Sequence, residues 1–239
     1  MTEQKSRRVL YSSKLKNFPE RVEGLSPQDE LNLYLVANGL KPASELILMS
    51  HFYETPKEKL NKKDLDDFKK LLESLGVRYN VMGNTFGLSW PLDPFLSVFI
   101  GRNEKDLRGL LEAKTDEEIG IALGYPKKAV RAYGKKVEGI VRNGKYEVVS
   151  AYEAEKSGKL PSWVAYISHV PEEADYLKGS IAKSSQSLGR RYEKFVKSNN
   201  PGLAKRVEEQ HRNRMRPEEW RLDKGEYKVR YKEYPDDWF

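Results

Sequence analysis

The stretch Lys178–Arg216 reads KGSIAKSSQSLGRRYEKFVKSNNPGLAKRVEEQHRNRMR and holds the excess positive charge of the chain. It contains 11 Lys or Arg against 3 Glu, a balance of 11 − 3 = +8, whereas the whole chain of 239 residues carries +7. The remaining residues therefore sum to 7 − 8 = −1. Positive charge concentrated in this way is typical of a surface that meets phosphate groups.

The same stretch has the apolar spacing of two helices. Apolar residues recur on one face of a 3.6-residue period, and the residues 199–202 (NNPG) interrupt the pattern. The two rows are Leu188, Tyr192, Phe195 and Val196, followed by Leu203, Val207, His211 and Met215.

The cations of this stretch lie away from both apolar rows. A solvated face on ordinary core helices would have the same pattern, but two consecutive helices that carry all the net charge favour an anionic partner. We therefore predict phosphate contacts from these residues: Lys183, Arg190, Arg191, Lys194, Lys197, Lys205, Arg206, Arg212, Arg214 and Arg216.

The composition excludes several classes of protein. The chain has no cysteine, which rules out disulfides, thiolate metal sites and a cysteine nucleophile, and which fits a cytoplasmic location. The start MTEQKSRRVLYSS shows no apolar signal segment, and apolar runs are too short for a membrane span. One residue in three is charged, as in thermophile proteins with surface ion-pair networks.

Capping residues locate most of the remaining helices. Ser26 is placed to cap a helix that ends at Gly39, and Asn61 to cap one that ends at Gly76. Further along, Asn103 caps a third helix, and Thr115 with Glu118 forms a capping box before a short helix that ends at Gly124.

Apolar and alternating runs predict the strands. The expected strands are Glu45–Phe52, Val77–Met82 with a hairpin partner at Thr85–Trp90, Phe95–Ile100, Tyr146–Ser150, Trp163–Ser168 and an edge strand in the tail.

These elements give an α/β or α+β fold, in which a mixed sheet has flanking helices and a basic helical C-terminal extension. We expect a mobile basic arm over residues 1–24 and an α/β domain over 25–170. The basic helical extension covers 171–222, and a strand with an aromatic and acidic C-terminus covers 223–239.

The tail has aromatic residues suited to contacts with protein. Tyr227, Val229 and Tyr231 alternate as in an edge strand, and the chain ends in two Asp residues followed by Trp238 and Phe239. An edge strand can pair with a second copy or close its own sheet, and the acidic end should avoid RNA. We predict partner or dimer contacts from Tyr227, Tyr231, Trp238 and Phe239.

Two other functions remain open from the residues. The segment 115–133 resembles a helix-turn-helix, with Lys127, Lys128 and Arg131 on its second helix, so a DNA-binding protein is one alternative. His51 and His169 each follow a predicted strand and could serve a metal- or ligand-dependent enzyme. Known catalytic motifs are absent from the sequence, so we expect no enzyme, no catalytic or metal-binding residues and no cofactor.

Two stretches, LGYPKKAVRAY (Leu123–Tyr133) and PSWVAYISHVPEE (Pro161–Glu173), resemble a family of archaeal cytosolic proteins with a Leu-Gly-Tyr-Pro turn. Together with the basic helices, the chain is similar to the archaeal ribosome dimerisation factors. Relatives often carry cysteines after Gly-Tyr-Pro, where this chain has Lys128 and Ala129.

The resemblance implies a ribosome hibernation factor that regulates translation. Such a protein is a cytoplasmic homodimer that binds the rRNA and ribosomal proteins of the small (30S) subunit, pairs small subunits and blocks their association into 70S ribosomes. It also implies that the protein performs no catalysis.

Overall fold

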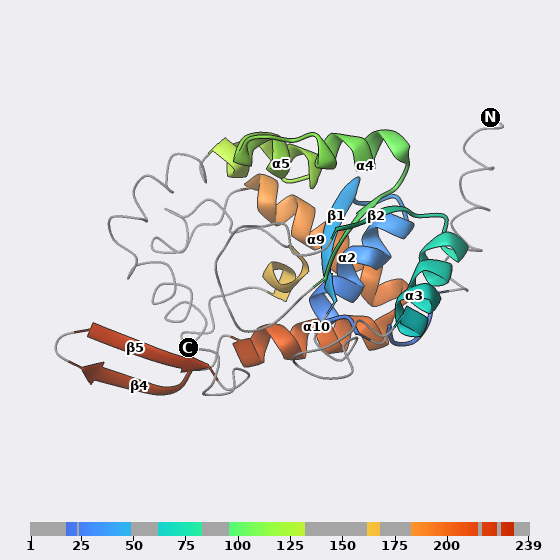
Figure 1. Cartoon of the computed structure of the whole chain (residues 1–239). Coiled ribbons are helices and arrows are strands. Elements are labelled where there is room, and N and C mark those ends of the chain that lie inside the picture. The colour runs from blue at the N-terminus through green and yellow to red at the C-terminus, as the bar shows by residue number, and fades with distance from the viewer. Residues whose placement is uncertain are drawn as a thin grey trace. The chain divides into compact units, whose positions relative to one another are not determined.

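The structure is a computed structural model that describes residues 18–22, 24–48, 62–82, 96–131, 162–167, 183–214, 217–223 and 226–231. The chain divides into two compact units, Met1–Gly124 and Tyr125–Phe239, which we call the first and the second unit (Figure 1). Within the described ranges, no helix is both long and apolar enough to span a bilayer.

The first unit is built around an antiparallel sheet of three strands in the order β1-β3-β2. The central strand β3 pairs with both neighbours, so that Gly101 lies opposite Ala43 on one side and Arg78 on the other. Its elements are α2 (Pro27–Ala37), β1 (Ala43–Leu48), α3 (Lys62–Ser74), β2 (Arg78–Met82), β3 (Leu96–Gly101), α4 (Glu104–Leu111) and α5 (Asp116–Ala122).

Helices cover both faces of this sheet (Figure 1). Because side chains alternate along a strand, β1 and β3 send Leu46, Leu48, Val98 and Ile100 to one face, where they pack with apolar residues of α2 and α3. On the other face, Phe99 packs with Leu107 and Leu110 of α4 and with partly buried residues of α5. Helices flanking the sheet confirm the α+β form of the predicted fold class, but both strand pairs of this sheet are antiparallel, whereas the sequence predicts a mixed sheet.

The predicted caps at Ser26, Asn103 and Thr115 are confirmed, whereas Asn61 lies outside the described residues. The Ser26 side chain accepts a hydrogen bond from the backbone N–H of Asp29 at 3.1 Å, and Asn103 accepts one from Asp106 at 2.9 Å. Thr115 and Glu118 form the predicted capping box at the start of α5. Such caps satisfy backbone donors that a helix cannot satisfy itself, which is why local sequence alone locates them.

The second unit contains the two predicted basic helices. Its described elements are η2 (Ser162–Tyr166), α9 (Lys183–Asn199), α10 (Pro201–Arg214), β4 (Pro217–Asp223) and β5 (Glu226–Tyr231), with helical residues also at 127–131. Asn200 separates α9 from α10, and its side-chain Oδ1 accepts a hydrogen bond from the N–H of Leu203 at 3.0 Å. Pro201 follows at the first helical position, where its missing N–H costs nothing.

The predicted strand Trp163–Ser168 is wrong. Residues Ser162–Tyr166 form the 3-10 helix η2, and Trp163, Val164 and Ile167 make one apolar cluster with Leu188 of α9. A short apolar run shows no clear helical or strand period. The conformation of this run is therefore set by its packing against α9 and not by its local sequence. The same contacts join this segment to the first of the two basic helices.

The predicted hairpin partner of Val77–Met82 lies in the range 85–90, outside the described residues, and β2 pairs with β3. The basic helical extension was expected to reach residue 222, but α10 ends at Arg214 and Pro217–Asp223 forms β4. Proline at 217 cannot continue a helix, and Trp220 and Leu222 alternate as strand residues do. The expected strand Tyr146–Ser150 lies outside the described residues.

Candidate nucleic-acid interface

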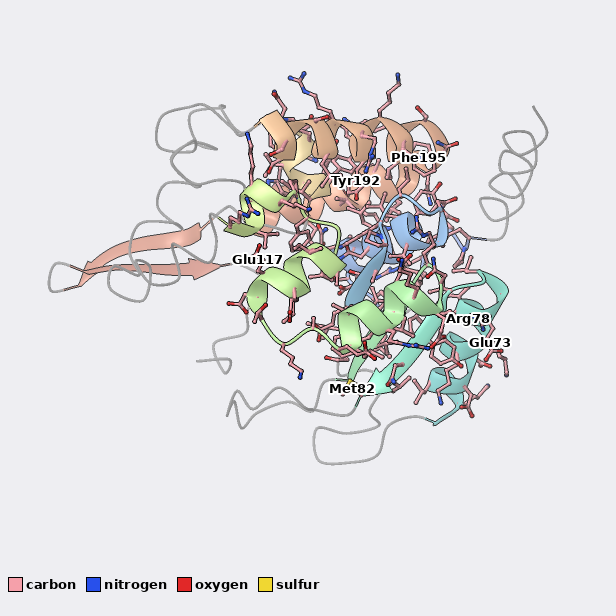
Figure 2. All side chains as sticks on the ribbon, turned by 90° about the horizontal axis from the view of Figure 1, so that it is seen from above. Glu73, Arg78, Met82, Glu117, Tyr192 and Phe195 are labelled. Carbon is pink, nitrogen blue, oxygen red and sulfur yellow. The ribbon has the colours of Figure 1, made fainter. Side chains whose placement is uncertain are left out.

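α9 has one buried face and one exposed face. Ser185, Gly189, Tyr192 and Val196 are buried at i, i+4, i+7 and i+11, and this row meets η2 and α10. The partly buried Phe195 lies beside it, and Tyr192 and Phe195 are labelled in Figure 2. Nitrogen-tipped side chains extend from α9 on the side away from η2 (Figure 2).

Three predicted phosphate contacts lie together on the exposed face of α9. Arg190, Arg191 and Lys194 occupy positions i, i+1 and i+4, and all three are exposed. Four residues of α-helix rise about 6 Å, so the three charges lie within one turn or little more. Within the described residues, no carboxylate pairs with Arg190 or Lys194. We call these three residues the cationic face of α9.

An aromatic ring supports one of these cations. The guanidinium carbon of Arg191 lies 5.4 Å from the ring centroid of Tyr192, within the range of a cation–π contact. Burial raises the pKa of Tyr192, and the neighbouring Arg191 acts in the opposite direction. The phenol of Tyr192 therefore stays neutral at physiological pH and does not neutralise the positive charge of Arg191.

α10 contributes further predicted cations. Lys205 and Arg212 are exposed, and Lys205 lies 3.9 Å from Glu209, an exposed pair of low strength. Arg206 is half-buried. The opposite side of α10 buries Leu203 and Val207.

Lys197 differs from the other cations because two carboxylates hold it. Its Nζ lies 2.8 Å from Glu193 Oε1 on α9 and 2.8 Å from Glu208 Oε1 on α10. The Lys197 side chain is 45% exposed, whereas those of Glu193 and Glu208 are only 17% and 24% exposed. Hydrogen bonds with both carboxylates raise the pKa of Lys197. We call Lys197, Glu193 and Glu208 the Lys197 cluster.

Residues of η2 complete the Lys197 cluster from a third element. The hydroxyl of Ser162 donates to Glu193 Oε1 at 2.6 Å, and the hydroxyl of Tyr166 donates to Glu208 Oε1 at 3.0 Å. Burial raises the pKa of Tyr166, and the negative charge of Glu208 raises it further. Tyr166 therefore acts as a neutral hydrogen-bond donor throughout the physiological range.

Several predicted site residues lie wholly or in part outside the described residues. Lys183 begins α9 and Arg214 ends α10, but their side chains lie outside the described part of the structure, as does the whole of Arg216. Trp238, Phe239, His51 and His169 also lie outside it. Tyr227 and Tyr231 are in β5, which pairs with β4 so that Tyr227 lies opposite Leu222 and Tyr231 opposite Pro217.

The helix-turn-helix-like segment 115–133 has the expected first helix, α5. Helical residues resume at 127–131, where Lys127, Lys128 and Arg131 are exposed. The two helices fall in different units, since the division follows Gly124. A groove-reading role for this segment stays a prediction.

A buried lysine in the first unit gives no signal in the sequence. Lys41 is only 3% exposed, and its Nζ donates to Asn32 Oδ1 at 2.8 Å and Ser44 Oγ at 3.1 Å. Burial lowers the pKa of Lys41 to about 7, although the charge of Asp29 acts in the opposite direction. An amine titrating near neutral pH is unusual for a lysine, and burial is the largest cause of this shift.

Comparisons with known proteins find no match for this chain. The chain matches no protein-family model, no curated protein and no solved structure. Among the described residues, His, Asp and Glu form no group of three that could hold a metal ion. The proposal below therefore depends on the charges and contacts of the second unit.

Proposed function

We propose that the protein is a ribosome-binding, non-catalytic factor that contacts the RNA of the small ribosomal subunit through the cationic face of α9. The observation that carries this proposal is the grouping of Arg190, Arg191 and Lys194 on the exposed side of a helix whose other side is packed. Binding to RNA backbone requires cations on a rigid scaffold, because A-form RNA is recognised mainly by shape and phosphate position.

The distribution of negative charge also supports the proposal. Of the acidic residues on α9 and α10, Glu193 and Glu208 are held by Lys197, and Glu209 lies near Lys205. These three carboxylates therefore have Lys197 or Lys205 as an ion-pair partner. A phosphate that approaches the cationic face of α9 meets little repulsion from these two helices.

The second part of the proposal is that two copies of the protein pair two small subunits. A dimer with one RNA-binding surface on each copy can hold two subunits at once and obstruct the joining of the large subunit. The β4–β5 hairpin is the element we propose for this pairing, because Tyr227, Val229 and Tyr231 occupy alternate positions of β5. On this proposal the factor stores small subunits in a dormant state.

Co-sedimentation with purified small ribosomal subunits tests the RNA-binding surface. Replacing Arg190, Arg191 and Lys194 together by Glu should abolish co-sedimentation, because attraction to phosphate becomes repulsion. The matched control replaces three exposed cations of the first unit, Lys105, Arg108 and Lys114, by Glu. It makes the same change in net charge and should co-sediment normally. Equal binding by both variants would refute the proposal.

The same preparation distinguishes the two other functions. A DNA-binding protein would prefer duplex DNA over small subunits in direct competition, and Lys127→Glu with Lys128→Glu would weaken it. An enzyme would lose its function through His51→Ala or His169→Ala without any loss of subunit binding. The proposal predicts that neither of these results is obtained.

A further inference from the structure

Lys197 sits among the predicted phosphate contacts in the sequence but has a different environment from its neighbours. It forms two ion pairs of 2.8 Å each, one within α9 and one across to α10. Both partner carboxylates also accept a hydrogen bond from η2, through Ser162 and Tyr166. To reach a phosphate, the ammonium would have to leave both carboxylates, which are more buried than it is and would lose their counter-charge.

The position of Glu193 shows what Lys197 prevents. Glu193 follows Arg190 by three residues on the same helix, a spacing at which opposite charges pair. Burial raises the pKa of Glu193, whereas hydrogen bonds from Lys197 and Ser162 lower it. The positive charges of Lys197 and Arg190 lower it further, so the pKa of Glu193 lies below its usual value. Arg190 is therefore within electrostatic reach of Glu193. Without Lys197, the carboxylate would turn to Arg190.

The charge balance leads to the same conclusion. The Lys197 cluster carries one positive and two negative charges, a net charge of 1 − 2 = −1. Removal of Lys197 would leave −2 beside the cationic face of α9. Glu193 would then compete with phosphate for Arg190.

We propose that Lys197 is a positioning residue of the interface and not a phosphate contact: it holds Glu193 and Glu208, and so keeps Arg190 available to the RNA backbone. This inference rests on the proposed RNA binding. It removes Lys197 from the set of phosphate contacts, since its ammonium is paired with two carboxylates of the protein itself. It also assigns a role to Ser162 and Tyr166, which each donate a hydrogen bond to one of the two carboxylates.

The salt dependence of RNA binding tests this assignment, because its slope counts phosphate contacts. The probe is a fluorescein-labelled RNA duplex, titrated by fluorescence anisotropy at several salt concentrations with the full chain. Lys197→Met should weaken binding roughly threefold to tenfold and reduce the slope by about 1, because Glu193 then occupies Arg190. Adding Glu193→Gln to Lys197→Met should restore the wild-type slope, since the competing carboxylate is gone.

Lys194 provides the matched control on the same helix. Lys194→Met should also reduce the slope by about 1, because it removes a true phosphate contact. Adding Glu193→Gln to Lys194→Met should leave the slope reduced, since a lost contact cannot be recovered by neutralising a carboxylate. Restoration in the Lys197 pair together with no restoration in the Lys194 pair is the expected result.

Three outcomes would overturn the assignment. A slope that stays reduced in the Lys197→Met, Glu193→Gln variant would make Lys197 a contact like Lys194. Unchanged RNA binding by Lys197→Met would show that Lys197 has neither a contact role nor a positioning role in the interface. A wild-type protein that fails to bind RNA would refute the proposed function itself, a result distinct from the other two. If Lys197→Met does not fold by circular dichroism, Lys197→Gln allows the same comparison, because it removes the charge and retains hydrogen-bond donors.

Discussion

The backbone of Gly189 in α9 lies directly against Trp163 of η2. A Cβ at position 189 would lie 2.8 Å from the carbonyl oxygen of Trp163 and even closer to its indole ring. Trp163 is only 2% exposed, so it has no free space into which to move. The absence of a side chain at 189 is what allows η2 to pack on the face of α9 opposite the cations.

Gly189→Ala should therefore destabilise the protein, although alanine normally favours helices. Overpacking of this kind costs about 1–3 kcal/mol, which exceeds the gain of up to about 1 kcal/mol from replacing glycine within a helix. Urea denaturation of the full chain, followed by tryptophan fluorescence, measures the change. Gly202→Ala in α10 is the control, because a Cβ there meets nothing nearer than 3.7 Å. Equal stability of the two variants would contradict the packing argument.

The salt dependence of wild-type RNA binding provides a second prediction. If about five cations of α9 and α10 contact phosphate, log K should fall against log salt with a slope of roughly −3.5 to −4.5. Fluorescence anisotropy with small subunits or an RNA duplex measures this slope. A slope near zero would mean that phosphate contacts do not hold the complex.

Local signals in the sequence predicted the parts of the fold that depend on neighbouring residues. Ser26, Asn103 and the pair Thr115 and Glu118 identified helix starts, because a cap acts within three residues. The pairing of Glu193 with Lys197 could likewise have been predicted, since it joins residues i and i+4 of one helix.

Contacts between distant residues could not be predicted in this way. Tyr166 and Glu208 are 42 residues apart, so the sequence gives no sign that they form a hydrogen bond. Lys197 was predicted to contact phosphate because its position on the helix is outward, and only Glu208 from α10 gives it a second partner. The apolar run around Trp163 was predicted to be a strand. Its packing against Gly189 joins two separate elements, so the sequence gives no sign of the contact that accompanies the 3-10 helix.

The β4–β5 hairpin leads to the third prediction, that of a homodimer. By register, Trp220 lies opposite Val229 and Leu222 opposite Tyr227, so apolar residue types occupy paired positions of the two strands. A two-stranded hairpin is marginally stable alone, so pairing with a second copy would stabilise it. We expect a dimer mass by light scattering at micromolar concentration.

Charge substitution on each face of the hairpin tests this expectation. Tyr227→Lys with Val229→Lys should shift the mass to that of a monomer, because two charges would enter the apolar face. Lys228→Glu with Arg230→Glu alters the opposite face of β5 and should leave the mass unchanged. A wild-type monomer mass, or dissociation by the second pair alone, would refute pairing through the apolar face.

The last prediction concerns Lys41 and the pH dependence of stability. In the unfolded chain its amine has the ordinary pKa of 10.5, whereas burial lowers the pKa to about 7 in the folded protein. Between these values the unfolded state holds a proton that the folded state has released. The free energy of unfolding should therefore rise with pH from about 7 to 10.5, by at most about 1.4 kcal/mol per pH unit from this residue.

Comparison with Lys41→Met isolates this contribution, because methionine fills similar space and does not titrate. Urea denaturation at several pH values should give a shallower rise for Lys41→Met than for the wild type. The stability of Lys41→Met relative to the wild type should be greatest at pH 7 and below, where the buried amine of the wild type becomes protonated. Lys105→Met, at an exposed position of α4, should leave the pH dependence unchanged. If Lys41→Met keeps the wild-type slope, the amine of Lys41 does not titrate in this range, and its hydrogen bonds with Asn32 and Ser44 must stabilise the charged form.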